Sequence, residues 1–211
     1  MSIARATTVD SGGSSCSASR AETEEDARAK PLGIWTFVVA DCASFAVLFL
    51  VFMTERSQQR TLFSASAAQL DVPLGLANTL ILLTSGWLVA RATASAEAGD
   101  RDAVVRHLGL ALASGAAFGL VKIVEYWRKI STGTTPLTND FFSYYFVLTG
   151  LHFLHYLAGI GVLILLLSKA RRQGTAIDQN FLRFLGSGAI YWHLVDLLWI
   201  FLFPMLYLQG R

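Results

Sequence analysis

The sequence contains little cysteine and little charge, and both shortages exclude whole classes of protein. Its two cysteines lie far apart, Cys16 in a polar segment and Cys42 in an apolar one, so there is no disulfide framework and no cysteine metal motif. A thiolate-bridged dinuclear copper centre would need two cysteines close in sequence. Charged residues make up only 15% of the chain, the net charge is +2, and no basic cluster alternates with aromatic residues, which excludes a nucleic-acid partner.

Motifs for nucleophilic or phosphate chemistry are also missing. No Ser or Cys lies in a recognisable activating motif, and no glycine-rich phosphate loop occurs. Residues 1–30 hold no apolar run of signal-peptide length, are rich in Ser, Ala, Glu and Arg, and end in an acidic and then basic run. We therefore expect residues 1–30 to be a disordered tail in which Cys16 is a free thiol.

Long hydrophobic runs, in contrast, are abundant. Hydrophobic residues make up 54% of the chain and the mean hydropathy is +0.49, which is typical of an integral membrane protein. Only helices satisfy the backbone in lipid without closing a barrel, and each span needs about 20 residues. We therefore predict an all-α membrane domain at 31–211 with five transmembrane helices. The predicted spans are Leu32–Met53, Pro73–Ala92, His107–Trp127, Phe141–Ser168 and Leu182–Leu208.

Lysine and arginine are divided unequally between the two predicted membrane faces. The tail and the second and fourth loops together carry more of them than the first and third loops and the carboxyl terminus. Because these residues favour the cytoplasmic side, we expect the amino terminus in the cytoplasm and the carboxyl terminus outside. Lys122 falls inside the third span, where we expect it to pair with Glu125, three residues further on.

Several ionisable residues lie within the predicted spans, where lipid cannot solvate them. His193 and Asp196, near the middle of the fifth span, are three residues apart, so they share a helix face and can hydrogen-bond each other or a common partner. His152 and His155 share a face of the fourth span for the same reason. Such residues usually mark a packed polar site. The whole set consists of Asp41, Glu125, His152, His155, His193 and Asp196.

Three functions are compatible with these residues. Imidazoles in a membrane bundle can ligate haem, and bis-histidine ligation would need a histidine of the fourth span to face His193. A transporter or proton path would use intramembrane ionisable groups, although the chain shows no inverted repeat and no pair of broken helices. The third function is that of a non-catalytic bundle, held together by a polar network, that docks on a larger partner. The residues alone favour this third function by elimination.

Several motifs resemble subunit III of the haem-copper oxidases. They cover Leu32–Leu208, almost everything after the tail, and occur in the same order as in that family. The start of the first span resembles that of the shorter, five-helix bacterial versions, and the ending from Trp199 to Tyr207 is most similar to the NorE branch associated with nitric oxide reductase. The motifs are Gly33-Ile34-Trp35, Ala40-Asp41-Cys42, Phe49, Pro73, Asn78-Thr79, Leu83-Thr84-Ser85, Glu125-Tyr126, Thr149–His155 with Gly159, and Tyr191–Trp199.

The resemblance implies a subunit III-like accessory subunit of a cytochrome oxidase or nitric oxide reductase, without catalytic, cofactor-binding or metal-binding residues of its own. Haem and copper or iron would lie in partner subunits. The chain would pack beside the haem-bearing subunit I, with other subunits and phospholipid, in the bacterial inner membrane, where it would support assembly, the lipid environment and proton uptake. An independent transporter or a haem b carrier is the alternative. Longer members have two more amino-terminal helices beside a lipid-filled cleft. This sequence has no counterpart of those helices, so the resemblance does not imply a lipid cleft in this chain.

The resemblance also bears on the polar residues. Asp41 stands where many family members have Glu. We expect Asp41 and Glu125 to contact lipid or another subunit. We expect His193 and Asp196 to be structural and to fix the fifth span against the third and fourth. The residues that match buried polar positions of the family are Glu125, His152, His155, His193 and Asp196.

Overall fold

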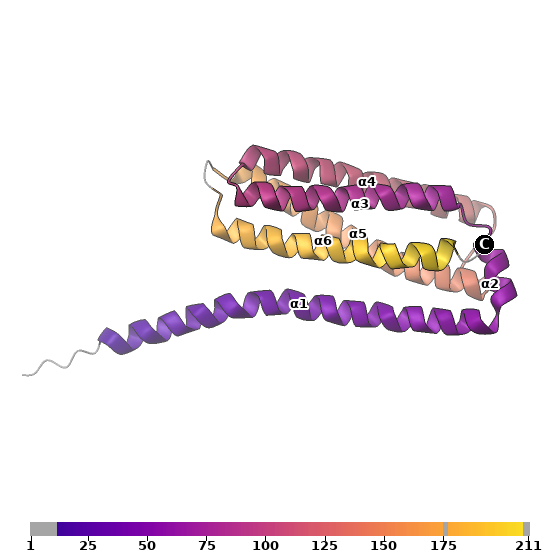
Figure 1. Cartoon of the computed structure of the whole chain (residues 1–211), viewed down its shortest axis with the longest axis horizontal. Coiled ribbons are helices and arrows are strands. Elements are labelled where there is room, and N and C mark those ends of the chain that lie inside the picture. The colour runs from indigo at the N-terminus through magenta and orange to yellow at the C-terminus, as the bar shows by residue number, and fades with distance from the viewer. Residues whose placement is uncertain (1–11, 175–176, 209–211) are drawn as a thin grey trace, which may run out of the picture. The chain divides into compact units, whose positions relative to one another are not determined.

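The described residues of the chain are almost entirely helical. The computed structural model describes the backbone of residues 12–174 and 177–208, and the side chains of residues 33–174 and 177–208. Within these ranges there are six helices and no strand (Figure 1). The helices are α1 Gly12–Gln58, α2 Arg60–Ala67, α3 Val72–Glu97, α4 Arg101–Ser131, α5 Asp140–Arg172 and α6 Gln179–Tyr207.

The five predicted spans are confirmed as helices long and apolar enough to cross a membrane. They correspond to Gly33–Gln58 of α1 and to the whole of α3, α4, α5 and α6. The helices extend past the hydrophobic runs at most of their ends, because polar residues continue the helical backbone beyond the apolar segment. The backbone is helical from Gly12, inside the segment that we expected to be disordered. The assignment of residues 1–30 as a tail stays a prediction.

Side-chain caps fix the starts of three of the membrane helices. Asp71 accepts a hydrogen bond from the Leu74 amide at 3.0 Å, with Pro73 in the first turn of α3. Asp100 and Asn139 cap α4 and α5 by the same geometry, each accepting from an amide three residues on at 2.9 Å. These bonds satisfy amides that a helix leaves unpaired at its start. The second predicted span, which begins at Pro73, therefore starts in the first turn of α3.

Helices α3 to α6 pack side by side in a closed ring (Figure 1). Along this ring α3 contacts α4, α4 contacts α5, α5 contacts α6, and α6 contacts α3. Aromatic side chains fill the middle, where Phe118 and Trp199 lie edge to face with their ring centroids 5.1 Å apart. The ring therefore places residues from distant parts of the sequence in one core.

Small residues of α4 allow its neighbours to approach closely. Ser85 of α3 donates a hydrogen bond to the Ala111 carbonyl at 2.8 Å, and Tyr156 of α5 donates one to the Gly115 carbonyl at 2.9 Å. A side chain at Gly119 would collide with the Tyr156 phenol. The ridge of small residues on α4 therefore serves packing within this chain.

The chain divides into two units, residues 1–39 and 40–211, and α1 runs through both. In the second unit α1 is held mainly by aromatic contacts near its end. The Phe52 ring packs against Phe63 of α2 and Tyr144 of α5 at centroid separations of 5.5 and 5.9 Å. Helix α2, which the sequence did not predict, contacts both α1 and α5 through Phe63.

Candidate functional site

A buried ion pair at the end of the ring where α6 ends is part of the most extensive polar cluster in the described residues. Lys122 and Glu125 of α4 have side chains only 1% and 7% exposed, and Lys122 Nζ lies 2.9 Å from Glu125 Oε2. The predicted pairing is therefore confirmed. Lys122 lies nine residues before the end of α4, about 13 Å along the axis, so the pair lies inside the third predicted span and not in the loop that follows it.

Two tyrosines from other helices complete this cluster. Tyr145 of α5 and Tyr207 of α6 donate hydrogen bonds to Glu125 Oε1 at 2.8 and 2.5 Å. Lys122 also donates to the Tyr207 hydroxyl at 3.1 Å and lies 4.9 Å from the ring of Trp199. Both charges are thus satisfied by protein groups, as lipid would require. The cluster ties three helices together at the end of α6.

A cavity of about 210 Å³ reaches the cluster from the same end of the ring. Glu125 forms part of its wall, together with Arg128 and Lys129 of α4 and Asp71 at the start of α3. The carboxylate is therefore adjacent to a polar recess, although its side chain is mostly buried.

A second pair connects α1 to α5. His155 Nε2 lies 3.0 Å from Asp41 Oδ1, and the His155 ring meets Phe45 edge to face at a centroid separation of 5.5 Å. His155 Nδ1 bonds its own helix at the Leu151 carbonyl, and Tyr191 of α6 donates to the His155 carbonyl at 3.1 Å. The other oxygen of Asp41 is buried without a partner in the described part of the chain.

The third pair is His193 with Asp196, both on α6. Their facing atoms, Nδ1 and Oδ2, are 3.6 Å apart, and the side chains are 46% and 7% exposed. Gly86 of α3 lies directly against Asp196, so close that a side chain there would overlap the carboxylate. Asp196 therefore packs against α3, the second span, a contact that the sequence did not predict, and the role of the pair in fixing the fifth span against the third and fourth stays a prediction. Periodicity places two residues on one face but does not say which helix that face meets.

His152 lies in a different environment from the other histidines. It is fully buried, and its ring packs on Trp199 at 5.1 Å and against Phe118 at 5.9 Å. Neither ring nitrogen has a hydrogen-bond partner among the described residues. The predicted polar residues therefore form separate pairs and one isolated histidine in the described structure, and not a single connected network.

The sequence did not reveal Tyr145 and Tyr207 as partners of Glu125, or Gly86 as the contact of Asp196. The position of Lys122 inside a predicted span could have indicated such partners, since a buried ammonium and carboxylate need more hydrogen-bond partners than they offer each other. No group of three or more His, Cys, Asp or Glu side chains in the described residues could hold a metal ion.

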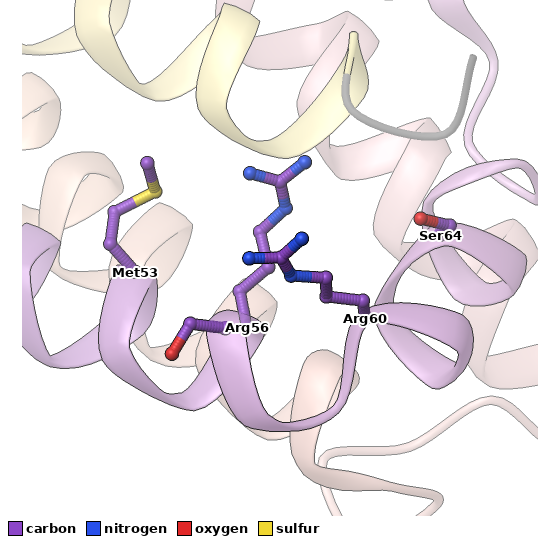
Figure 2. A pocket seen from close by; sticks show the side chains of 5 residues that line it. Met53, Arg56, Arg60 and Ser64 are labelled. Atoms are coloured by element: carbon purple, nitrogen blue, oxygen red, sulfur yellow. The ribbon is translucent and has the colours of Figure 1, made fainter.

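A basic pocket lies where α1 ends and α2 begins. Its volume is about 440 Å³, and Figure 2 shows the side chains of Arg56 and Arg60 extending to the same side of the two helices. Met53, Ser57 and Ser64 complete the lining. Neither guanidinium forms an ion pair with an acidic side chain in the described ranges. Two guanidinium groups beside the Ser64 hydroxyl are a donor set that suits an anionic group.

The chain matches one known protein family over most of its length. Residues 21–211 match the model of the family described as cytochrome c oxidase subunit III. The chain belongs to this family. The match includes all the helices of the ring and every polar pair described above.

Individual relatives of this subunit III family member are of similar length. The chain is 30% identical over 179 residues to cytochrome bo(3) ubiquinol oxidase subunit 3 of Pseudomonas aeruginosa, covering 84% of each protein. It is 32% identical over 187 residues to quinol oxidase subunit 3 of Bacillus spizizenii, covering 88% of this chain and 90% of the relative. Cytochrome c oxidase subunit 3 of Thermostichus vulcanus is 28% identical over 204 residues, or 97% of this chain and 98% of the relative.

Proposed function

We propose that this chain is the non-catalytic subunit III of a respiratory haem-copper oxidoreductase. The observation that carries the proposal is the match to the subunit III family over residues 21–211, together with relatives of similar length that are named as oxidase subunits. In this role the chain packs beside a haem-bearing catalytic subunit and supports its assembly, lipid environment and proton uptake. Haem and copper or iron belong to the partner subunits.

The polar pairs support a structural role for the ionisable residues. Glu125 receives three hydrogen bonds from within the chain, and Asp41 pairs with His155 across two helices. We keep Asp41 and Glu125 as candidates for contact with lipid or another subunit, since Asp41 has one buried oxygen without a described partner and Glu125 borders a cavity.

The direct test is purification of the tagged chain from its native membrane. We expect a haem-bearing protein to co-purify, visible as a Soret band and identified by mass spectrometry. The chain expressed alone and purified in detergent should show no Soret band. A stoichiometric haem signal from the chain alone would instead favour a haem b carrier. Proton or solute movement by the reconstituted chain without partners would favour a transporter.

The same purified complex tests the finer predictions. The branch linked to nitric oxide reductase predicts that the co-purifying enzyme reduces nitric oxide in the presence of an electron donor. Oxygen consumption without nitric oxide reduction would place the chain with the terminal oxidases. The identity of the co-purifying subunits then shows whether cytochrome c or quinol is the donor.

A further inference from the structure

A stripe of exposed residues on α6 has an ionisable group at its centre. Helix α6 is 29 residues long, and His193 is its middle residue. At about 1.5 Å per residue, His193 lies roughly 21 Å from either end, close to the middle of a bilayer with a hydrocarbon core of about 30 Å. The exposed or half-exposed residues that recur every three or four positions are Gly186, Ile190, His193, Leu197, Ile200 and Pro204.

The His193 side chain is 46% exposed at this depth, and its only ion-pair partner in the described ranges is Asp196. That contact uses Nδ1, so the other ring nitrogen, Nε2, is left for a group outside this chain. Asp196 Oδ1 is also buried without a hydrogen-bond partner among the described residues. Lipid tails have no hydrogen-bonding groups, and neither water nor headgroups reach the middle of an intact bilayer. A polar group from another protein is therefore needed here.

Other exposed faces of the bundle carry no such requirement. On α4 the exposed residues Leu120, Ile123 and Trp127 are apolar or aromatic and suit contact with lipid. On the α6 stripe His193 lies between Ile190 and Leu197, and Gly186, two turns before His193, leaves open space because it has no side chain. A small residue on the same stripe allows a neighbouring helix to approach closely, and that helix can then hydrogen-bond His193.

We propose that the α6 stripe is the docking site for a transmembrane helix of the haem-bearing catalytic subunit, with a hydrogen-bonding side chain of that helix facing His193. This inference rests on the proposed function. A second copy of this chain is a poorer occupant, because two-fold packing on the stripe would set each His193 against the same ring of the other copy, and both rings already contact their own Asp196 through Nδ1. A different chain can supply a complementary donor or acceptor instead.

Photo-crosslinking in the assembled complex tests the docking site. A photoreactive phenylalanine replaces Leu197, one turn from His193, and in a matched control it replaces Ile123 on α4, which is exposed to a similar degree. We expect crosslinks to the haem-bearing subunit from position 197 in clear excess over position 123. Equal yields, or crosslinks from position 197 only to lipid or to a second copy of the chain, would overturn the docking site while the co-purified haem protein upholds the proposed function. Absence of any haem-bearing protein would overturn both.

Substitution of His193 provides an independent measurement. His193→Leu removes the hydrogen-bonding group, and we expect on the order of tenfold less haem protein to co-purify, since one lost buried hydrogen bond changes an equilibrium by about that factor. His193→Gln, which can still hydrogen-bond, should retain more. The amount of tagged chain in the membrane monitors folding. Full co-purification with His193→Leu at normal expression would overturn the proposal.

Discussion

A lysine and a glutamate buried at the depth of lipid must be neutralised by groups of the protein itself. In this chain Lys122 and Glu125 neutralise each other, and Tyr145 and Tyr207 supply the remaining donors. Removal of one charge leaves the other buried without a counterion, whereas replacement of both by neutral side chains of similar size leaves no buried unpaired charge. Comparing the single with the double substitution therefore shows whether the fold needs the ion pair itself or only the absence of an unpaired buried charge.

We expect Glu125→Gln to lower the free energy of unfolding by about 3–5 kcal/mol, because Lys122 would keep its charge without a carboxylate. The double substitution Lys122→Met with Glu125→Gln should recover most of this loss. Thermal unfolding of the purified chain in detergent measures both. A double variant less stable than Glu125→Gln would show that the ion pair itself stabilises the fold beyond its mutual neutralisation.

The pair between Asp41 and His155 joins α1 to the ring. We expect Asp41→Ala to loosen this part of α1 and to raise maleimide labelling of the neighbouring Cys42 by about fivefold, the factor for roughly 1 kcal/mol. Cys16 is replaced by Ser so that only Cys42 reports. Ser44→Ala is the control, because in the described ranges the Ser44 hydroxyl bonds only the Ala40 carbonyl of its own helix. Equal labelling in the two variants would mean that the pair does not hold α1.

At the scale of helices, glycine decides how closely α5 and α6 approach. A side chain at Gly159 would lie 2.8 Å from the Trp192 ring, whereas one at Gly150 of the same helix would meet nothing within 4 Å. Trp192 is fully buried and cannot move aside without disturbing the core. The two glycines therefore form a matched pair of positions on one helix.

We expect Gly159→Ala to destabilise the chain by about 1–3 kcal/mol, the usual cost of overpacking a tight core. Gly150→Ala should be neutral or slightly stabilising, since alanine favours helix over glycine by up to about 1 kcal/mol. Thermal melting of the two variants side by side provides the measurement. Similar losses at both positions would indicate an effect on helix propensity and not on packing.

The features that could be predicted from the sequence are local, and those that could not are contacts between helices distant in sequence. The length of the hydrophobic runs predicted all five spans, and the spacing of three residues predicted the Lys122–Glu125 pair. Each depends on residues close in sequence. Three features depend instead on which helices are neighbours: the contact of Asp196 with α3, the tyrosines that bond Glu125, and the short helix α2. The periodic pattern of hydrophobic residues does not show which helices lie side by side.

At the scale of the whole molecule, the charges at the ends of the spans predict its orientation. The end of α3, the start of α4, the end of α5 and the start of α6 lie at one end of the ring, and the end of α6 lies at the other (Figure 1). The first end is bordered by Arg101 and Arg106 of α4, and by Lys169, Arg171 and Arg172 of α5. Because basic residues are retained in the cytoplasm, we expect this end inside and the basic pocket at Arg56 and Arg60 outside.

Reporter fusions in bacterial cells test this orientation. Alkaline phosphatase, which is active only outside the inner membrane, should be active when fused after Arg211 and inactive when fused after Gly99. Green fluorescent protein at the same two positions should give the opposite pattern. The reversed pattern would place Arg56 and Arg60 in the cytoplasm and would mean that packing against partner subunits, and not loop charge, determines the topology. Replacing Lys169, Arg171 and Arg172 by Gln should then leave the orientation unchanged, whereas under our prediction it weakens the asymmetry and yields molecules of both orientations.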